Sequence, residues 1–322
     1  MLTVVVPTRN RAHMLADVLE AYCQVQSPPS GWKLVVVDNG STDPTAEVLA
    51  SFANRLPLQS VAEPRIGQNF ARNAGLALAE GDLTVFADDD TFPHADWLVE
   101  LRKAADSRPE FSLFGGAVAP RWEAPPPPWV RWVVEAPSTG GRNSEVRAGP
   151  VYSITDPALA EGPIPPWLVF GGNMAFRSGI FQSGIRFDPA IGPRGSSYPI
   201  GGETILLIEL GRQGHKAWHV PRAIVEHFIR KEQLAKSWVL ARAIRFGRGQ
   251  YRAAHTGNAG SAELRRSALL HLPPRLLAVA LLMLAEGVTF RPQAFFRARW
   301  RFNFFWGQVL EAQNLARERE SR

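Results

Sequence analysis

Three consecutive aspartates, Asp88, Asp89 and Asp90, have the residue type and spacing that most clearly suit chemistry in this chain. They follow the apolar run 83–86, which is typical of a short buried strand. Adjacent carboxylates repel one another unless a cation or hydrogen-bond donors compensate them. Mg²⁺ prefers oxygen ligands, commonly one or two carboxylates together with substrate phosphates. The cluster therefore predicts a metal–diphosphate site, and the alternative is a solvated acidic turn in which Asp90 or Thr91 caps a helix.

Composition and charge limit which partners, disulfides and membrane segments this chain can have. The chain has 322 residues, 45% of them hydrophobic, and a formal net charge of +6, with basic residues concentrated after residue 220. A basic excess suits nucleic acid, anionic lipid or phosphate-bearing substrates. Cys23 is the one cysteine, so no disulfide can form within the chain. No signal-peptide pattern opens the sequence, and the longest apolar run, 276–285, is too short to span a bilayer.

Strand and helix patterns alternate through the first part of the chain, with short connections between them. This alternation predicts βαβ units and a parallel sheet. The expected strands are residues 2–6, 33–37, 59–62 and 83–86, and the expected helices are 11–24, 45–54 and 68–79.

Polar residues follow three of these strands: Thr8-Arg9-Asn10, Asp38-Asn39 and the three aspartates. The carboxyl ends of parallel strands meet at one edge of a sheet, where open α/β sheets bind ligands, so we expect one crevice. The first strand is followed by neither Gly-x-Gly-x-x-Gly nor a P-loop. Those absences argue against a dinucleotide-binding fold and a P-loop ATPase.

Four segments resemble family 2 glycosyltransferases of the GT-A fold in their residues, order and spacing. They are VVVPTRNR at 4–11, VVVDNGSTD at 35–43, ARNAG at 71–75 and FADDDTFP at 86–93. The resemblance implies an α/β fold, a Rossmann-like and mostly parallel sheet flanked by helices. It also implies an inverting enzyme that uses a nucleotide-diphosphate sugar and Mg²⁺ or Mn²⁺.

The resemblance assigns roles at the strand ends. Asp90 would ligate the metal, and Asp88 would contact the ribose or reach the metal through water. Asp38 would hold the base or ribose, and Arg72 would contact the diphosphate or brace the aspartates. The remaining positions expected to contact the nucleotide sugar are Pro7, Thr8, Arg9 and Asp89.

Later segments add three candidates. Asn173 lies in VFGGNMAFR at 169–177, which resembles the family's Gly-Gly-Asn strand near the donor sugar, and would bind a sugar hydroxyl. Glu203 opens the helix expected at 205–211 and is the predicted general base, because an acceptor hydroxyl must lose its proton as it attacks. Family members usually carry a second acid where this chain has Thr204, and Glu203 could instead only stabilise a helix N-terminus. His227 follows short strands at 215–220 and 223–225 and resembles a third metal ligand of some GT-A enzymes; a structural histidine is the alternative.

Composition divides the chain into two regions. Residues 1–230 are the predicted GT-A domain. It comprises a nucleotide-binding half at 1–119, a Pro- and Trp-rich insertion at 120–168 and an acceptor or catalytic half at 169–230. Further strands are expected at 111–119 and 169–177, and a helix at 97–105. We interpret the insertion as a substrate-covering segment, or else as a surface elaboration packed on its tryptophans, 122, 129, 132 and 167.

Residues 231–322 are a basic, aromatic helical extension. Arginines interleaved with phenylalanine and tryptophan favour contact with a membrane surface through residues 231–310. The alternatives are a helical pair packed on the catalytic domain or on a second subunit. Nucleic acid is not an expected partner, because no nucleic-acid-binding module is recognisable.

The sequence as a whole predicts a metal-dependent inverting glycosyltransferase that moves a sugar to the hydroxyl of a glycan or lipid-linked acceptor, in cell-surface polysaccharide or glycoconjugate synthesis. We expect it in the cytoplasm or peripheral on the cytoplasmic face of the membrane. A non-catalytic nucleotide-sugar-binding or scaffold protein is the alternative that Thr204 favours. A nucleotidyltransferase is less compatible, because Pro7-Thr8-Arg9-Asn10 replaces its glycine-rich turn. The sugar, the acceptor and the oligomeric state stay open.

Overall fold

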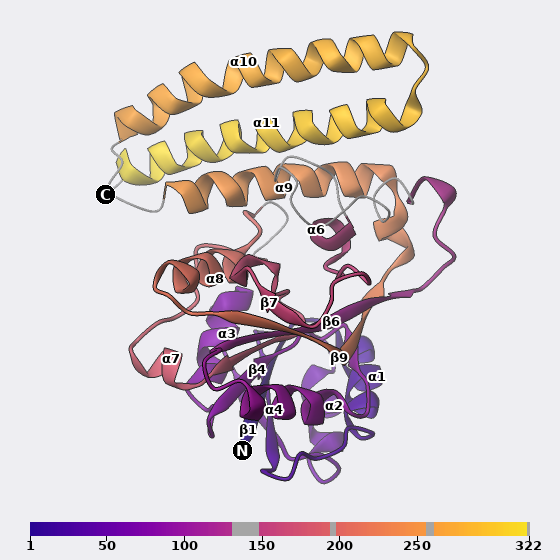
Figure 1. The fold of residues 1–322 in the computed structure, drawn as a ribbon, viewed down its shortest axis with the longest axis vertical. Helices are drawn as coiled ribbons and strands as arrows, with labels where there is room; N and C mark the ends of the chain where they lie inside the picture. The colour runs from indigo at the N-terminus through magenta and orange to yellow at the C-terminus, as the bar shows by residue number, and fades with distance from the viewer. Residues whose placement is uncertain (131–147, 194–197, 256–260, 321–322) are drawn as a thin grey trace. The chain divides into compact units, whose positions relative to one another are not determined.

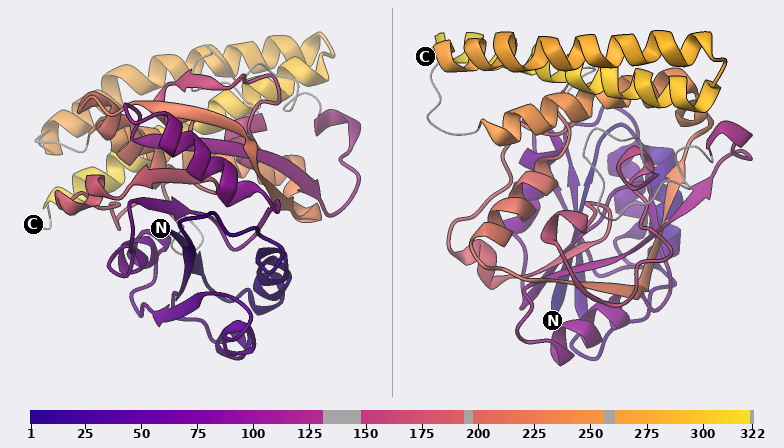
Figure 2. Two further views of the ribbon diagram at one scale, coloured as in Figure 1. Left: turned by 60° about the horizontal axis from the view of Figure 1, so that its bottom comes forward. Right: turned by 45° about the horizontal axis from the view of Figure 1, so that its top comes forward.

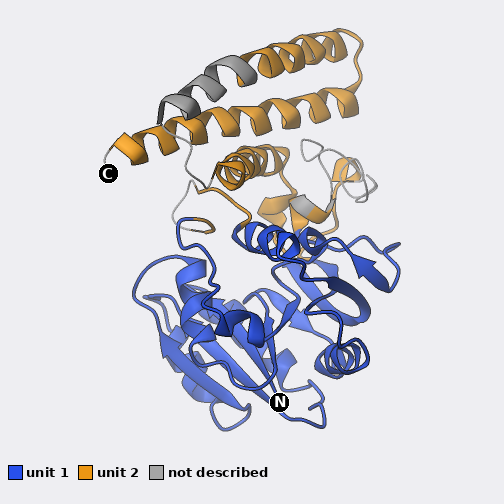
Figure 3. Ribbon diagram, turned by 60° about the vertical axis from the view of Figure 1, so that its left-hand side comes forward, with its two compact units in different colours: residues 1–121, 153–190, 202–228 blue, residues 122–152, 191–201, 229–322 orange. Residues whose placement is uncertain are grey.

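A computed structural model describes residues 1–130, 148–193, 198–255 and 261–320 (Figure 1). The chain forms two compact units (Figure 3): unit 1 comprises residues 1–121, 153–190 and 202–228, and unit 2 comprises residues 122–152, 191–201 and 229–322. Unit 1 therefore contains the strand ends, the aspartates, Glu203 and His227. Unit 2 contains the three long C-terminal helices.

The four predicted strands at the start of the chain are confirmed as the parallel half of a mixed sheet. They are β1 (Leu2–Thr8), β2 (Trp32–Asp38), β3 (Leu58–Ala62) and β4 (Leu83–Phe86). They lie in the order β3-β2-β1-β4, with every neighbouring pair parallel. The valines and leucines of β1, β2 and β4 are buried on both faces, the pattern expected of parallel strands covered by helices, whereas β3 is partly exposed.

The sheet continues with antiparallel strands. β8 (Met174–Arg177) pairs with β4, and β6 (Leu113–Trp122), β9 (Ala217–Ile229) and β5 (Thr91–Pro93) follow in that order. β7 (Gly162–Ile164) pairs with β9. The prediction of two strands around Pro221 was wrong, because β9 runs unbroken through it. Pro221 falls between the segment paired with β7 and the segment paired with β5, so its missing N–H interrupts neither ladder.

Helices cover both faces of the parallel strands, and Figures 1 and 2 show α3 on one side with α1 and α2 on the other. The helices of unit 1 are α1 (Ala12–Tyr22), α2 (Thr45–Phe52), α3 (Gln68–Leu76), α4 (Trp97–Ser107), α7 (Gly179–Gln182) and α8 (Gly202–Arg212). Gly75 lets α3 approach the sheet, because a Cβ there would stand 2.3 Å from Cγ1 of Val5. This packing holds the N-terminus of α3 beside the carboxyl ends of β1 and β2.

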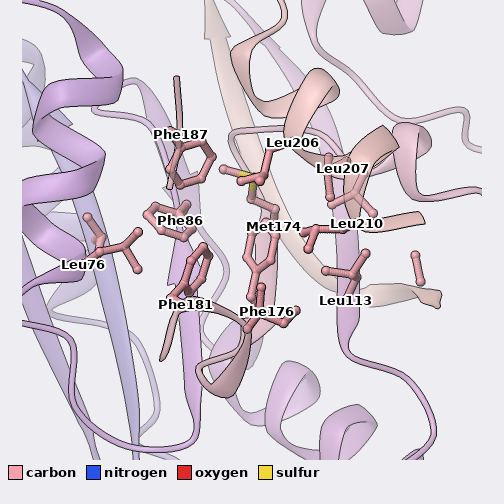
Figure 4. Close-up of a cluster of buried hydrophobic side chains, with 14 of the residues drawn as sticks. Leu76, Phe86, Leu113, Met174, Phe176, Phe181, Phe187, Leu206, Leu207 and Leu210 are labelled. Carbon is pink, nitrogen blue, oxygen red and sulfur yellow. The ribbon is translucent and has the colours of Figure 1, made fainter. Parts of the chain in front are cut away.

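An apolar core joins the two halves of the sheet in unit 1 (Figure 4). Phe86, at the end of β4, makes edge-to-face contacts with three other phenylalanines, at 176, 181 and 187. Met174 and the buried leucines of α8 complete the cluster. The aromatic packing of Phe86 therefore holds in place the end of β4, which the aspartates follow.

Unit 2 consists mainly of α9 (Lys236–Ala254), α10 (Ser261–Val288) and α11 (Pro292–Glu320), with the short helices η1 (Pro128–Val130), α6 (Ala148–Tyr152) and η3 (Lys231–Leu234). Figure 2 shows α10 and α11 as an antiparallel pair. Arg248 and Arg252 of α9 both bond to Glu311 of α11, whose side chain is fully buried. Among the described residues, no helix has both the length and the apolar content that a bilayer span needs.

The predicted insertion at 120–168 falls partly outside the described residues. Residues 131–147, with Trp132, are not described. The segment from Trp122 to Tyr152 belongs to unit 2, where Trp122 packs edge-on against Tyr152. Trp167 belongs to unit 1, on η2 (Pro166–Leu168), with 53% of its surface exposed. The substrate-covering role therefore stays a prediction.

Candidate active site

The ends of β1 and β4 meet through one buried hydrogen bond. Thr8 is the last residue of β1, and its hydroxyl donates to Oδ2 of Asp89 at 2.8 Å. The two strands are parallel neighbours, with Val5 opposite Phe86, so the residues that follow each strand emerge side by side. The ends of these two strands therefore lie close together, as their parallel arrangement predicts.

Asp89 is the most enclosed of the three aspartates, with 6% of its surface exposed. Nη1 of Arg11 donates to Oδ1 of Asp89 at 2.6 Å and also to Oδ2 of Asp90 at 2.7 Å. Burial raises the pKa of Asp89 to about 6, because it outweighs the opposing effect of the Arg11 guanidinium. Burial acts to lower the pKa of Arg11, but the carboxylates of Asp89 and Asp90 outweigh it and raise that pKa. Arg11 thus compensates the charges of Asp89 and Asp90.

Asp88 faces α3 rather than Arg11. Its Oδ1 accepts from Nε2 of Gln68 at 2.9 Å and from Nη2 of Arg72 at 3.2 Å. Burial raises the pKa of Asp88; the guanidinium of Arg72 lowers it, and the neighbouring charge of Asp90 adds to the rise. Both donors come from the first turns of α3, so the helix start positions the carboxylate.

Arg72 also joins Asp88 to the predicted general base. Its Nη1 lies 3.7 Å from Oε2 of Glu203, which stands in the first turn of α8. The arginine side chain is 2% exposed, whereas Asp88 and Glu203 are 27% and 25% exposed. The guanidinium also lies over the ring of Phe187, 5.5 Å from its centroid. One buried arginine therefore holds two partly accessible carboxylates from different elements within one small region.

Asp90 and His227 face one another where β5, the strand at the edge of the sheet, pairs with β9. Thr91, the first residue of β5, pairs with His227 of β9, and Nε2 of His227 lies 3.7 Å from Oδ1 of Asp90. Two ligands of one octahedral ion, each about 2.1 Å from it, are about 3.0 Å apart when adjacent and about 4.2 Å apart when opposite. The Asp90–His227 distance lies between these two values, so the two side chains would have to move closer by about 0.7 Å to take adjacent positions on one divalent ion. Arg11 bonds to the other oxygen of Asp90.

In the part of the chain that the structure describes, no group of three or more His, Cys, Asp or Glu side chains could hold a metal ion. Mg²⁺ and Mn²⁺ are commonly bound by one or two side chains, with waters and substrate phosphates filling the other positions. The carboxylate–imidazole pair of Asp90 and His227 fits that kind of site.

The end of β2 forms a separate, ordered turn. Asp38 accepts through Oδ1 from the backbone N–H of Ser41 at 2.9 Å. Gly40 makes this turn possible with a φ of 71°, in the left-handed region. Asn10 accepts from the N–H of Thr42 at 2.7 Å, which fastens the turn to the end of β1. Of the other predicted nucleotide contacts on β1, Pro7 is buried and Arg9 is exposed.

Asn173 has a well-defined structural role. It is fully buried, its Oδ1 accepts from the indole N–H of Trp97 at 2.8 Å, and its amide donates to the carbonyls of Ala117 and Ala223, each at 2.8 Å. Oδ1 of Asn173 could accept a second bond, but the side chain is fully buried, so the contact with a sugar hydroxyl stays a prediction. Its bonds fasten the start of β8 to β6, β9 and α4.

Three residues with clear roles were not among the predicted site residues. Arg11 and Gln68 bond to the aspartates. Asn39 is buried and bonds to the carbonyls of Glu63 and Arg65 and to the N–H of Gly67, so it fixes the loop that leads into α3. The available signal was position: Asn39 directly follows β2, and Arg11 lies three residues after β1, at the same sheet edge as the aspartates.

Residues 3–148 match the family model described as Glycosyl transferase family 2. The chain carries a glycosyl transferase family 2 domain. That match contains Thr8, Arg11, Asp38, Arg72 and the three aspartates, whereas Glu203 and His227 lie beyond it.

Curated relatives agree with this family 2 assignment. Glycosyltransferase AglE of Haloferax volcanii is 31% identical over 119 residues, which are 36% of this chain and 39% of that protein. The chain spans less than half the length of the first curated relatives that it matches, at 39%, 20% and 21%.

Two solved structures share the fold. Mannosyltransferase PcManGT of Pyrobaculum calidifontis, in complex with GDP-Man and Mn²⁺, is 18% identical, with a TM-score of 0.58 over 97% of this chain and 86% of that chain. S. aureus TarS 1-349 in complex with UDP-GlcNAc is 14% identical, with a TM-score of 0.52 over 97% and 92%. The family 2 domain thus has the GT-A fold that its sequence segments predicted.

Proposed function

We propose that this chain transfers a sugar from a nucleoside-diphosphate sugar to an acceptor hydroxyl, with inversion at the anomeric carbon. The observation that carries the proposal is the position of Arg72, which is within 4 Å of both Asp88 and Glu203. A carboxylate suited to proton removal therefore stands beside the carboxylates suited to the diphosphate end of the donor. The domain's family and fold support the same reaction class.

The donor would bind along the carboxyl ends of β1, β2 and β4. Asp38 would hold the base or the ribose, and Thr8 and Arg9 would line the nucleotide pocket with Pro7. PcManGT was determined with GDP-Man and TarS with UDP-GlcNAc, so the fold accommodates different nucleotides. We therefore propose the class of donor, a nucleotide-diphosphate sugar, and not one nucleotide.

Asp90 and His227 would hold the divalent ion, Mg²⁺ or Mn²⁺, with Asp88 reaching it through water. Their facing atoms are 3.7 Å apart, and Oδ1 of Asp88 already bonds to Gln68 and Arg72. When bound, such an ion would neutralise the charge that develops on the leaving diphosphate. Arg11 would keep Asp89 and Asp90 in place before the donor arrives, because it bonds to both.

Glu203 would take the proton from the acceptor hydroxyl as that oxygen attacks. Its carboxylate is partly accessible and is held by Arg72 from behind, so one oxygen can face a substrate while the other keeps its ion pair. Gly171 packs directly over this pair, since a Cβ there would stand 3.1 Å from Nη2 of Arg72 and 3.3 Å from Cδ of Glu203. The backbone at Gly171 thus limits how far the two side chains can move.

We further propose a glycan or lipid-linked acceptor and a role in surface polysaccharide or glycoconjugate synthesis. The primary experiment offers the purified chain UDP-, GDP- and dTDP-sugars with Mn²⁺ or Mg²⁺, with and without a lipid extract, and measures released nucleoside diphosphate. Metal-dependent release of one nucleoside diphosphate is the expected result. Release of pyrophosphate in a parallel reaction that contains a nucleoside triphosphate and a sugar 1-phosphate would indicate a nucleotidyltransferase. A thermal shift by one nucleotide without turnover on any acceptor would indicate a non-catalytic binding protein.

Asp90→Asn provides the matched test of the metal pair. We expect it to abolish release and the metal-dependent part of nucleotide binding, because the carboxylate that faces His227 loses its charge. Asp106→Asn is the control, since Asp106 lies on α4, is 63% exposed and is not one of the proposed site residues. Equal loss in both variants would contradict the assignment.

A further inference from the structure

Helix α10 has an apolar face that no other described side chain of its unit covers fully. Leu277, Leu281, Leu284 and Val288 are 63%, 58%, 68% and 77% exposed. Their spacing of four, three and four residues places them on one side of the helix. Soluble proteins rarely expose a contiguous row of large apolar side chains unless something binds there.

The turn after α10 extends this face with an aromatic residue in an unusual conformation. Phe290 is 91% exposed and has a φ of 52°. Its N–H bonds to the carbonyl of Gly287, and the N–H of Arg291 bonds to the carbonyl of Glu286. This is the bond pair of a Schellman motif, whose left-handed position is usually glycine. The chain therefore presents a large aromatic side chain to solvent at a position where glycine would fit better.

Positive charge lies beside the same apolar residues. Arg291 follows Phe290 and is exposed, and the exposed Arg299 lies over the ring of Phe295, which faces Gly287 of α10. On another side of α10, Leu282, which is 37% exposed, lines a hollow of about 210 Å³ together with Gln293, Arg297, Arg301 and Glu286. Between residues 273 and 301 the chain carries five arginines, at 275, 291, 297, 299 and 301, and one acid, Glu286. The surface thus combines exposed leucine and phenylalanine with a net positive charge.

We propose that this α10–α11 surface, formed by Leu277, Leu281, Leu284, Val288, Phe290 and the adjoining arginines, docks onto an anionic lipid bilayer. The apolar side chains would enter the interface between headgroups and acyl chains, and the arginines would meet lipid phosphates. None of the described helices is suited to cross the bilayer, so the contact lies in the plane of the interface.

A second copy of the chain fits this surface less well. Paired helices with apolar residues at such spacing usually carry opposite charges beside the seam. Here the residues beside the row supply arginine, and the one acid, Glu286, is half-buried. Two copies would bring like charges together, whereas an anionic bilayer supplies the opposite sign.

The test measures co-sedimentation of the full chain with vesicles of phosphatidylcholine alone and of phosphatidylcholine with phosphatidylglycerol. We expect binding to the anionic vesicles that weakens as salt is raised. Phe290→Gly should reduce binding about tenfold or more, because one interfacial aromatic side chain is lost. Glycine suits the backbone at this position, so the variant should keep its fold. Leu281→Gln with Leu284→Gln should reduce binding further. Trp167→Ala, which removes an exposed aromatic residue of unit 1, should bind like the original chain.

Three results would overturn the proposal. These are no binding to anionic vesicles, unchanged binding by the Phe290→Gly and Leu281→Gln/Leu284→Gln variants, or a dimer in solution that the leucine substitutions dissociate. The last result would assign the surface to a second copy. Because the assay needs neither donor nor acceptor, its outcome is independent of the proposed glycosyl transfer.

Discussion

Replacing Arg72 with methionine should destabilise unit 1 more than any loss of an exposed ion pair. Arg72 is 2% exposed and lies 3.2 Å from Asp88 and 3.7 Å from Glu203. Methionine keeps an aliphatic stem that can pack on Phe187 but removes the charge. The substitution therefore isolates the electrostatic role of the guanidinium.

The expected magnitude follows from distance and burial. At an effective dielectric constant of about 20, two unit charges about 3.5 Å apart attract by about 5 kcal/mol before desolvation is subtracted. Removing one partner of a fully buried pair typically costs about 3–5 kcal/mol. Asp88 and Glu203 are 27% and 25% exposed, so water compensates part of the loss. We expect a decrease of about 2–4 kcal/mol in the free energy of unfolding.

The pH dependence of this loss has a definite sign. Burial holds the pKa of Asp88 above its usual range, and Arg72 is the main group that lowers it. A raised pKa in the folded state means that stability falls as pH rises and Asp88 ionises. Without Arg72 that pKa rises further, so the penalty of Arg72→Met should be smaller at pH 5 than at pH 8.

Arg55→Met is the control. Arg55 bonds to Glu20 through two contacts of 2.6 Å, shorter than any contact of Arg72, but the two side chains are 47% and 54% exposed. Exposed pairs contribute about 0–1 kcal/mol. Urea unfolding of both variants, followed by circular dichroism, compares the two losses. An equal or larger loss for Arg55→Met would refute the reasoning that burial, and not distance, decides the contribution.

Three further predictions concern packing, capping and titration. Gly75→Ala should destabilise the protein by about 1–3 kcal/mol, because its Cβ would stand 2.3 Å from Val5, whereas Gly287→Ala, with nothing closer than 3.7 Å, should be neutral or stabilising in the same urea assay. Phe290→Gly should raise the free energy of unfolding by about 0.5–1 kcal/mol, since the strain of its left-handed backbone is relieved; a lower melting temperature would contradict this. Burial lowers the pKa of His219, so its contribution to stability is present above about pH 6.5 and is lost as pH falls; His219→Asn should reduce the difference in stability between pH 7.5 and pH 5.5.

The parallel half of the fold was predictable because its signal is local. The strands at 2–8, 32–38 and 83–86 are runs of buried valine and leucine, and their polar ends mark where they stop. β5 was missed because three residues, Thr91–Pro93, are too few to show a period. β8 begins only at Met174, since Gly171 and Gly172 form a turn where strand was predicted.

The contacts within the site were less predictable than its location. Arg11 comes two residues after Arg9, and only the tertiary arrangement distinguishes the arginine that bonds to Asp89 and Asp90 from the one that is exposed. Asn173 shows the same limit. Its amide suits a ligand or a structural network equally, and the choice depends on Trp97 and two carbonyls brought from other elements.

The most direct test of the proposed function is a comparison of Glu203→Gln with Glu209→Gln. Both residues lie on α8, but Glu209 is 53% exposed and pairs with Arg212 of that helix and Gln213 of the turn after it. With the donor identified by the release screen, transfer is measured in a single turnover, and donor binding is measured by calorimetry. We predict that Glu203→Gln lowers transfer by at least about a hundredfold while donor affinity changes little, and that Glu209→Gln retains both. Undiminished transfer by Glu203→Gln would contradict the assignment of the base.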